Sequence, residues 1–295
     1  MAVYKRTYKA YRGALTPAWS RFTVLSRYGF STLFQSRPFT AYTVLCFLPF
    51  LGGLAFIYVV NNASVQALFN VQFGRTPLIN NNWFLTFLSF EAFMSFVLTA
   101  WGAPGTISKD FANHGVQLYL SRPLSRVEYL IGKVSVIATL LSCTTWIPAL
   151  ILFLVQAELH GHGWGRENLW MVGSIFVAAM LWIALVSLLS MALAVWVRWR
   201  IAATALMLGI FFVLPGFGAA MDAILRTHWG MLLNFSYVMT AIWAHLFRIA
   251  EARSGHITGF DLVPLWSAWA SILSVCAISI WLLHRRLKAR EVERG

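Results

Sequence analysis

Two acidic residues stand inside apolar stretches of this chain, where an ionisable group could line a path or a gate. Glu91 has Phe90, Phe93 and Phe96 close to it in the sequence, and Asp222 lies near the end of a later apolar run. An ionisable group inside hydrocarbon is costly, so each should face a partner helix, a dimer interface or water. We expect each residue either to line a substrate path or gate, or to be a structural acid near the outer end of its helix.

No sequence motif gives the chain catalytic chemistry of its own. Gly132-Lys133 lacks the upstream glycine of a phosphate-binding P-loop, and the sequence contains neither His-Glu-x-x-His nor Gly-x-Ser-x-Gly. His160 and His162 lie two residues apart in a polar loop, which is a weak signal for a metal. We therefore expect no metal site and no enzyme activity in this chain.

The composition is that of a membrane protein. The 295 residues are 59% hydrophobic and only 11% charged, whereas soluble domains carry about 25% charged residues. Several apolar runs have the length of about 20 residues that spans a bilayer. These features exclude a soluble enzyme and a disordered chain. The net charge of +13 follows from topology, because Lys and Arg collect in cytoplasmic loops, and we expect no nucleic-acid partner.

We predict an all-α, polytopic membrane protein with six transmembrane helices. Residues 1–38 should form a basic cytoplasmic tail and an interfacial helix that lies among the lipid headgroups. Residues 39–295 should form the transmembrane domain, in which Pro148 predicts a kink. Residues 226–264 should form an external, re-entrant or interfacial helical hairpin before the last span. The predicted spans lie at residues 39–60, 83–101, 131–156, 169–196, 201–225 and 265–283.

The positive charges favour one orientation of these spans. With the N-terminus inside, 18 of the 23 Lys and Arg residues fall in cytoplasmic segments and five fall outside. A seventh span through residues 231–247 would place the basic C-terminal tail outside, against the positive-inside rule. We therefore predict that both termini and the loop 102–130 lie in the cytoplasm.

The loop 102–130 is the longest polar interval and carries the most specific sequence signal. Its ordered elements are Gly102-Ala103-Pro104-Gly105-Thr106-Ile107-Ser108-Lys109-Asp110, Ser121-Arg122-Pro123-Leu124-Ser125-Arg126, Glu128-Tyr129 and Gly132-Lys133. This order resembles the cytoplasmic loop of permease subunits of type-2 ABC exporters. Because proline disfavours helix at the preceding residue, Arg122-Pro123 should turn the chain back toward the third span.

The resemblance implies a function and a set of partners. It implies a permease (membrane-spanning) subunit of an ABC transporter that exports a substrate through the cytoplasmic (inner) membrane of a prokaryote. Two copies of a separate ABC ATPase subunit would bind ATP and Mg, so this chain would bind no cofactor itself. A second permease chain, either the same chain or a homologue, would meet it in the lipid bilayer along the first and fifth spans, or the second and fifth.

The resemblance also implies where force enters the chain. A short coupling helix that begins at Pro104 and carries Lys109 and Asp110 would dock on the ATPase. His114-Gly115 departs from the family pattern in mid-loop. The alternative is a non-transporting membrane anchor or assembly subunit of a larger complex with the same fold. The residues expected to couple to the ATPase are Pro104, Gly105, Ile107, Ser108, Lys109, Asp110, Arg122, Pro123, Arg126 and Glu128.

Overall fold

The computed structural model describes residues 21–68, 78–112, 126–197, 199–249 and 263–292, with only the backbone given at some helix ends. All regular structure in these ranges is helical, and six helices are long and apolar enough to cross a membrane. The prediction of an all-α, polytopic membrane protein is thereby confirmed. The six candidate spans are Arg37–Asn61, Asn81–Thr106, Val127–His160, Trp170–Trp196, Arg200–Leu225 and Leu265–Arg286.

The second and fourth spans form the centre of the bundle. They are α5 (Asn81–Ala112) and α10 (Trp170–Trp196), which pack against each other along much of their length. The two helices of the third span, α7 (Arg126–Thr144) and α8 (Trp146–His160), pack against both. The apolar window of the second span is 61% buried, compared with 22% in the first, fifth and sixth spans. These last three spans therefore present the most side-chain surface to lipid or to other chains.

A proline accounts for a break in each of the first and third spans. Proline has no N–H and its ring clashes with the carbonyl four residues earlier. The first span is divided into α2 (Arg37–Leu45) and α3 (Leu48–Asn61), and α2 ends four residues before Pro49. In the third span α7 ends four residues before Pro148, and Thr145 separates it from α8. The kink predicted from Pro148 is therefore present, one turn ahead of the proline.

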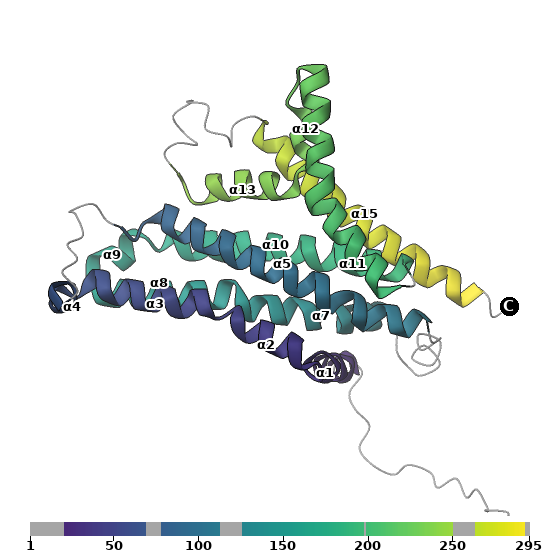
Figure 1. Ribbon diagram of the computed structural model, residues 1–295, viewed down its shortest axis with the longest axis horizontal. Coiled ribbons are helices and arrows are strands. Elements are labelled where there is room, and N and C mark those ends of the chain that lie inside the picture. The colour runs from purple at the N-terminus through teal and green to yellow at the C-terminus, as the bar shows by residue number, and fades with distance from the viewer. Residues whose placement is uncertain (1–20, 69–77, 113–125, 198, 250–262, 293–295) are drawn as a thin grey trace, which may run out of the picture.

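The fifth span bends in the same way but stays helical. It consists of α11 (Arg200–Leu208), a π-helical turn η2 (Gly209–Val213) and α12 (Leu214–Leu225). The π-turn lies one turn ahead of Pro215, and insertion of an extra residue in a turn is a known cause of a helix kink. Figure 1 shows α12 leaving the bundle at a steep angle to α5 and α10.

Two short helices, and not a seventh span, connect the described parts of the fifth and sixth spans. The 3₁₀-helix η3 (Trp229–Leu233) packs on α12, and α13 (Phe235–Leu246) packs on α10 and on α15 (Leu265–Val292), the sixth span. With 12 residues, α13 is shorter than the roughly 20 residues that cross a bilayer. The rest of the predicted hairpin, residues 250–262, lies outside the described residues.

The helix α1 (Arg21–Phe34) lies across the bundle and packs against α7. Figure 1 shows it almost end-on while α3, α5, α8 and α10 run from left to right. Leu25 and Leu33 are buried, whereas Tyr28 is exposed. An amphipathic helix that crosses the ends of the spans has the geometry expected of the predicted interfacial helix.

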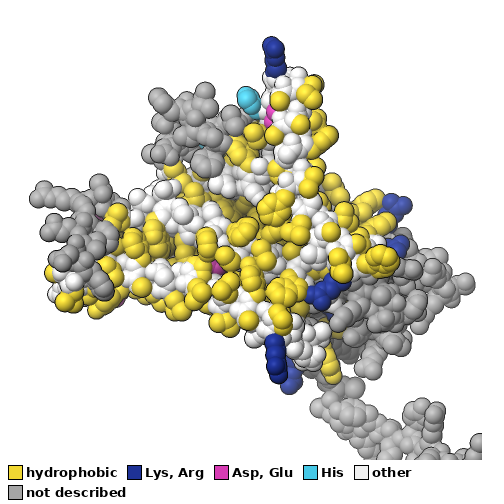
Figure 2. All heavy atoms as spheres, in the orientation of Figure 1, with side chains coloured by type: hydrophobic (Ala, Val, Ile, Leu, Met, Phe, Trp, Pro, Cys, Tyr) yellow, Lys and Arg dark blue, Asp and Glu magenta, His cyan; other side chains and the backbone are white. Residues whose placement is uncertain are grey.

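The bundle has two distinct ends. One end, here named the basal end, is formed by α1, the last turns of α5, the first turns of α7 and the start of α11 (Figure 1). The C-terminal part of α15 reaches this same end, as an even number of spans requires. The opposite, distal end carries the short helices α4 (Ala63–Leu68) and α9 (His162–Glu167). In the face that Figure 2 shows, most of the visible Lys and Arg atoms lie near the basal end.

The α1–α7 contact provides a test of this packing. A Cβ atom at Gly29 would lie 2.6 Å from Val136 Cγ2. Gly29→Leu is therefore expected to push α1 off α7 and to lower the free energy of unfolding by about 1–3 kcal/mol, seen as a lower unfolding temperature in detergent. Gly52→Leu is the control, because a Cβ at Gly52 meets nothing within 4 Å. Equal unfolding temperatures for the two variants would contradict the contact.

Candidate functional site

Both ends of the loop 102–130 are helical. The second-span helix continues past Trp101 to Ala112, and α7 begins at Arg126. Residues 104–110 are thus the last turns of α5, and not the start of a separate coupling helix as the sequence suggested. Glu128 lies in the first turn of α7 and is partly exposed. The side chains of Ile107, Ser108, Lys109, Asp110 and Arg126 are not described, and Arg122 and Pro123 lie outside the described residues.

Pro104 creates a docking point for the fifth span. Because this proline lies inside α5, the carbonyl of Ala100 lacks its usual helical donor. Thr204 of α11 donates its hydroxyl to the Ala100 carbonyl oxygen at 2.9 Å. One turn away, Arg200 donates Nη2 to the carbonyl oxygen of Trp101 at 3.1 Å. The helix continues through the proline because side chains of a neighbouring helix satisfy the backbone groups that it exposes.

A buried lysine joins α7 to the end of α5. Lys133 is only 7% exposed, and its Nζ donates to the carbonyl oxygen of Thr106 at 3.0 Å. The same Nζ lies 6.0 Å from the centroid of the Tyr129 ring, at the limit of a cation–π contact. On the other side of α7, the hydroxyl groups of Ser26 and Ser135 lie 2.7 Å apart. These contacts connect α1, α7 and the end of α5 into one unit, here named the basal lever.

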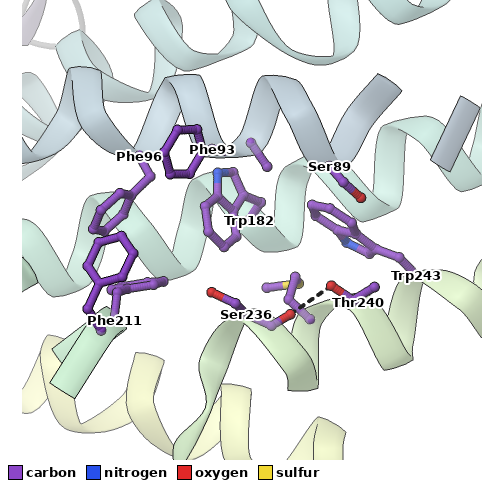
Figure 3. A pocket seen from close by; sticks show the side chains of 11 residues that line it. Ser89, Phe93, Phe96, Trp182, Phe211, Ser236, Thr240 and Trp243 are labelled. Carbon is purple, nitrogen blue, oxygen red and sulfur yellow. Dashed lines mark hydrogen bonds between the residues drawn. The ribbon is translucent and has the colours of Figure 1, made fainter. Parts of the chain in front are cut away.

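A pocket with a volume of about 190 Å³ opens at the middle of α5. Figure 3 shows that its side chains come from α5, α10, the π-turn η2 and α13. Phe93 and Phe212 are about half exposed or more and Ser236 is exposed, so the pocket opens on the surface of the chain. Its aromatic walls are formed by Phe93, Phe96, Trp182, Phe211, Phe212 and Trp243.

Internal hydrogen bonds hold the two tryptophans of this aromatic pocket. Trp182 donates its indole N–H to Ser95 Oγ at 2.9 Å, and Trp243 donates its own to the carbonyl oxygen of Ala178 at 3.1 Å. Because both indole N–H groups are satisfied, the two rings contribute apolar surface to the pocket. The hydroxyl of Thr240 is also satisfied, since it donates to the carbonyl oxygen of Ser236 at 2.8 Å.

The chemistry of the aromatic pocket favours an apolar or aromatic group as its occupant. Its described lining contains three hydroxyl side chains, those of Ser89, Ser236 and Thr240, and no charged group. Pockets of this kind bind mainly through apolar contact, with a few polar groups that orient the ligand. Hydrophobic side chains cover much of the surrounding face, as Figure 2 shows.

Glu91 does not line the aromatic pocket. It is 0% exposed, and both carboxylate oxygens lack a hydrogen-bond partner among the described residues. Residues two apart on a helix point in nearly opposite directions, so Glu91 faces away from Ser89 and Phe93 of the pocket. Tyr42 of α2 and Cys46, which directly follows α2, lie close enough to Glu91 to interact with it electrostatically. The structure therefore places this acid between the first and second spans.

Asp222 closes the turn between α12 and η3. Its Oδ1 accepts hydrogen bonds from the Gly230 N–H at 2.6 Å and from the Thr227 hydroxyl at 3.3 Å. Arg226, the residue that follows α12, has a left-handed backbone conformation with a φ of 52°. The two chain segments approach so closely that a Cβ atom at Gly218 or Gly230 would collide with the other's carbonyl oxygen. Of its two predicted roles, this geometry favours the structural one.

Removal of the Asp222 carboxylate should destabilise this turn. Asp222→Ala leaves the Gly230 N–H without its acceptor, and the expected loss in the free energy of unfolding is about 1–3 kcal/mol. Asp222→Asn keeps the accepting Oδ1 and should lose less. Unfolding temperatures of the two variants in detergent measure the difference. Transport lost in both variants without any change in unfolding temperature would instead place Asp222 in the substrate path.

The two histidines at the distal end lie in helices and not in the predicted loop, since α8 ends at His160 and α9 begins at His162. His160 Nδ1 lies 3.2 Å from Asn61 Oδ1, and its ring lies 6.2 Å from that of Trp164. The side chain of His162 is not described. Among the described residues, no group of three His, Cys, Asp or Glu side chains is placed to hold a metal ion.

Comparison with known proteins does not add to this description. Neither the models of known protein families nor the curated proteins match the chain. The function must therefore be inferred from the residue order at the basal end and from the geometry that connects this end to the aromatic pocket.

Proposed function

We propose that this chain is the permease subunit of an ATP-driven ABC transporter of the type-2 exporter class. It would lie in the inner membrane of a prokaryote with both termini in the cytoplasm, paired with a second permease chain and with two ATPase subunits that bind ATP and Mg. The observation that carries the proposal is the continuity of α5. One helix lines the aromatic pocket in its middle and carries residues 104–110 at its end.

This continuity offers a physical route for coupling. Ile107 lies 11 residues beyond Phe96 on the same helix, which corresponds to roughly 16 Å along its axis. Phe96 packs on Phe211 of the fifth span with ring centroids 4.4 Å apart. A push on the end of α5 would tilt the helix as a rigid body against the fifth span and change the shape of the pocket. Lys133 would make α7 and α1 follow the movement.

The aromatic pocket supports a substrate with an apolar or aromatic part. Its rim residues Phe93 and Phe212 are exposed on the second and fifth spans, which form one of the two alternative pairs of spans along which the resemblance places the contact between two permease chains. In such a dimer the two pockets would face a common route through the membrane. The polar hydroxyls on α13 would lie beside that route and orient a polar part of the substrate.

Purification of the tagged chain from its native membrane tests the proposal. The expected result is an ATPase subunit that co-purifies with the chain, hydrolyses ATP in the complex and brings a bound small molecule with it. A stable complex of other membrane proteins without any ATPase would contradict the proposal and support an anchor or assembly subunit.

A further inference from the structure

A groove beside Arg200 combines a cation with an apolar surface at the basal end. The groove has a volume of about 700 Å³ and follows the first turns of α11. A smaller cavity of about 50 Å³ lies on the other side of the same arginine, between the α1–α2 turn and α5. Arg200 lines both spaces. We name the larger space the α11 groove, with Trp101, Trp199, Ile201, Thr204, Ala205 and Leu208 as its other lining residues.

The arginine is held in place but keeps donors available. Its Nη2 donates to the carbonyl oxygen of Trp101. The guanidinium lies directly over Gly105, since a Cβ atom there would be 3.4 Å from Arg200 Nε. No described carboxylate lies within ion-pair distance of Arg200 in the structure. A guanidinium has five N–H donors, so an anion could bind to those that Trp101 does not use.

The walls of the α11 groove are apolar and exposed. Ile201 is 83% exposed and Trp199 is 78% exposed, although both are large apolar residues. Arg200 is the first residue of the fifth span, and tryptophans beside it are typical of the level where headgroups meet hydrocarbon. The groove therefore extends from a charged site at the headgroup level into the apolar layer.

We propose that the α11 groove binds an anionic phospholipid, with the phosphate at Arg200 and an acyl chain along α11. Guanidinium groups bind phosphate through charge-assisted, often bidentate hydrogen bonds. The apolar wall behind Arg200 suits a chain-bearing lipid more than a free phosphate ion. The Thr32 and Ser36 side chains of the neighbouring cavity lie where a polar headgroup would reach the turn after α1. Such a lipid would contact α1, α5 and α11 together at the basal end.

Native mass spectrometry of the full-length chain in detergent tests the lipid site. Phosphatidylglycerol and phosphatidylcholine with the same acyl chains would be titrated separately. One arginine near a membrane surface contributes about 1 kcal/mol to binding of anionic lipid, so the expected preference for phosphatidylglycerol is about fivefold. Arg200→Gln should abolish this preference. Arg248→Gln is the matched control, because Arg248 stacks on Trp170 at the distal end and should keep it.

Two further measurements distinguish binding of a lipid from binding of a simple anion. Ala205→Phe fills the groove and leaves Arg200 intact, so it should reduce retention of phosphatidylglycerol even if Arg200→Gln proves difficult to purify. Inorganic phosphate at millimolar concentration should not displace the lipid. An unchanged preference in Arg200→Gln, an unchanged retention in Ala205→Phe, or full displacement by inorganic phosphate would each overturn the proposal.

Discussion

Reversal of the charges of Lys109 and Asp110 is expected to detach the ATPase from this chain. These residues lie in the last turns of α5, where the proposed function places the contact with the partner. Loss of a charge pair in a buried interface costs about 2–5 kcal/mol, so Lys109→Glu combined with Asp110→Lys should weaken association at least about thirtyfold. Co-purification of the ATPase and the ATP hydrolysis of the complex measure the effect.

The matched control reverses a charge at the tip of α12, which projects out of the bundle (Figure 1). Arg226→Glu changes the residue after α12, remote from the basal end, and should leave association unchanged. The unfolding temperature of the double variant should equal that of the wild type, because positions 109 and 110 lie in the last turns of α5. Normal ATPase binding by the double variant would remove Lys109 and Asp110 from the coupling site.

Filling the aromatic pocket is expected to stop transport without loss of the ATPase. Ser236 is exposed at the rim, on α13, so a larger side chain there should not disturb the fold. Ser236→Trp would occupy much of the 190 Å³ volume. The indole would take the volume that the substrate needs, so substrate binding should weaken at least about tenfold, or by about 1.4 kcal/mol. The measurement is ATP-driven uptake of the co-purified molecule into inside-out vesicles.

Ser274→Trp is the matched control for Ser236→Trp. Ser274 is exposed on α15 and its hydroxyl bonds to its own helix, as the Thr240 hydroxyl does on α13. Ser274→Trp should therefore transport normally, with the same amount of bound ATPase. Wild-type uptake by Ser236→Trp would show that the substrate does not pass through the aromatic pocket.

The sequence predicted the spans because their signal is local. Apolar length alone identifies six segments that cross a bilayer, and the fourth, predicted at 169–196, is Trp170–Trp196 in the structure. The rule for proline also acts locally, so Pro148 indicated the kink in the third span. The resemblance, by contrast, implied that a separate helix begins at Pro104, whereas this proline lies inside α5. There the exposed carbonyl of Ala100 is bonded by Thr204 from another helix, and a sequence does not reveal that partner.

The parts of the site that the sequence missed are made by contacts between distant segments. The aromatic pocket needs Phe96, Trp182 and Trp243 from three different helices, and each of them alone is indistinguishable from a residue that contacts lipid. Lys133 had a visible signal, because it is a lysine two residues inside the predicted span 131–156, but its acceptor at Thr106 comes from α5. The position of Glu91 inside the second span was predicted and agrees with the structure, whereas its burial and its orientation toward α2 required the structure.

Photo-crosslinking from the end of α5 tests the central claim most directly. A photoreactive phenylalanine analogue would replace Ile107 at the basal end or, in the control, Leu159 near the distal end of α8. Membranes from cells that express the partner proteins would be illuminated and the adducts identified by mass spectrometry. We predict an adduct with an ATPase subunit from position 107 and none from position 159. Absence of an ATPase adduct at position 107, or equal adducts at both positions, would contradict the assignment of this chain as an ATPase-coupled permease.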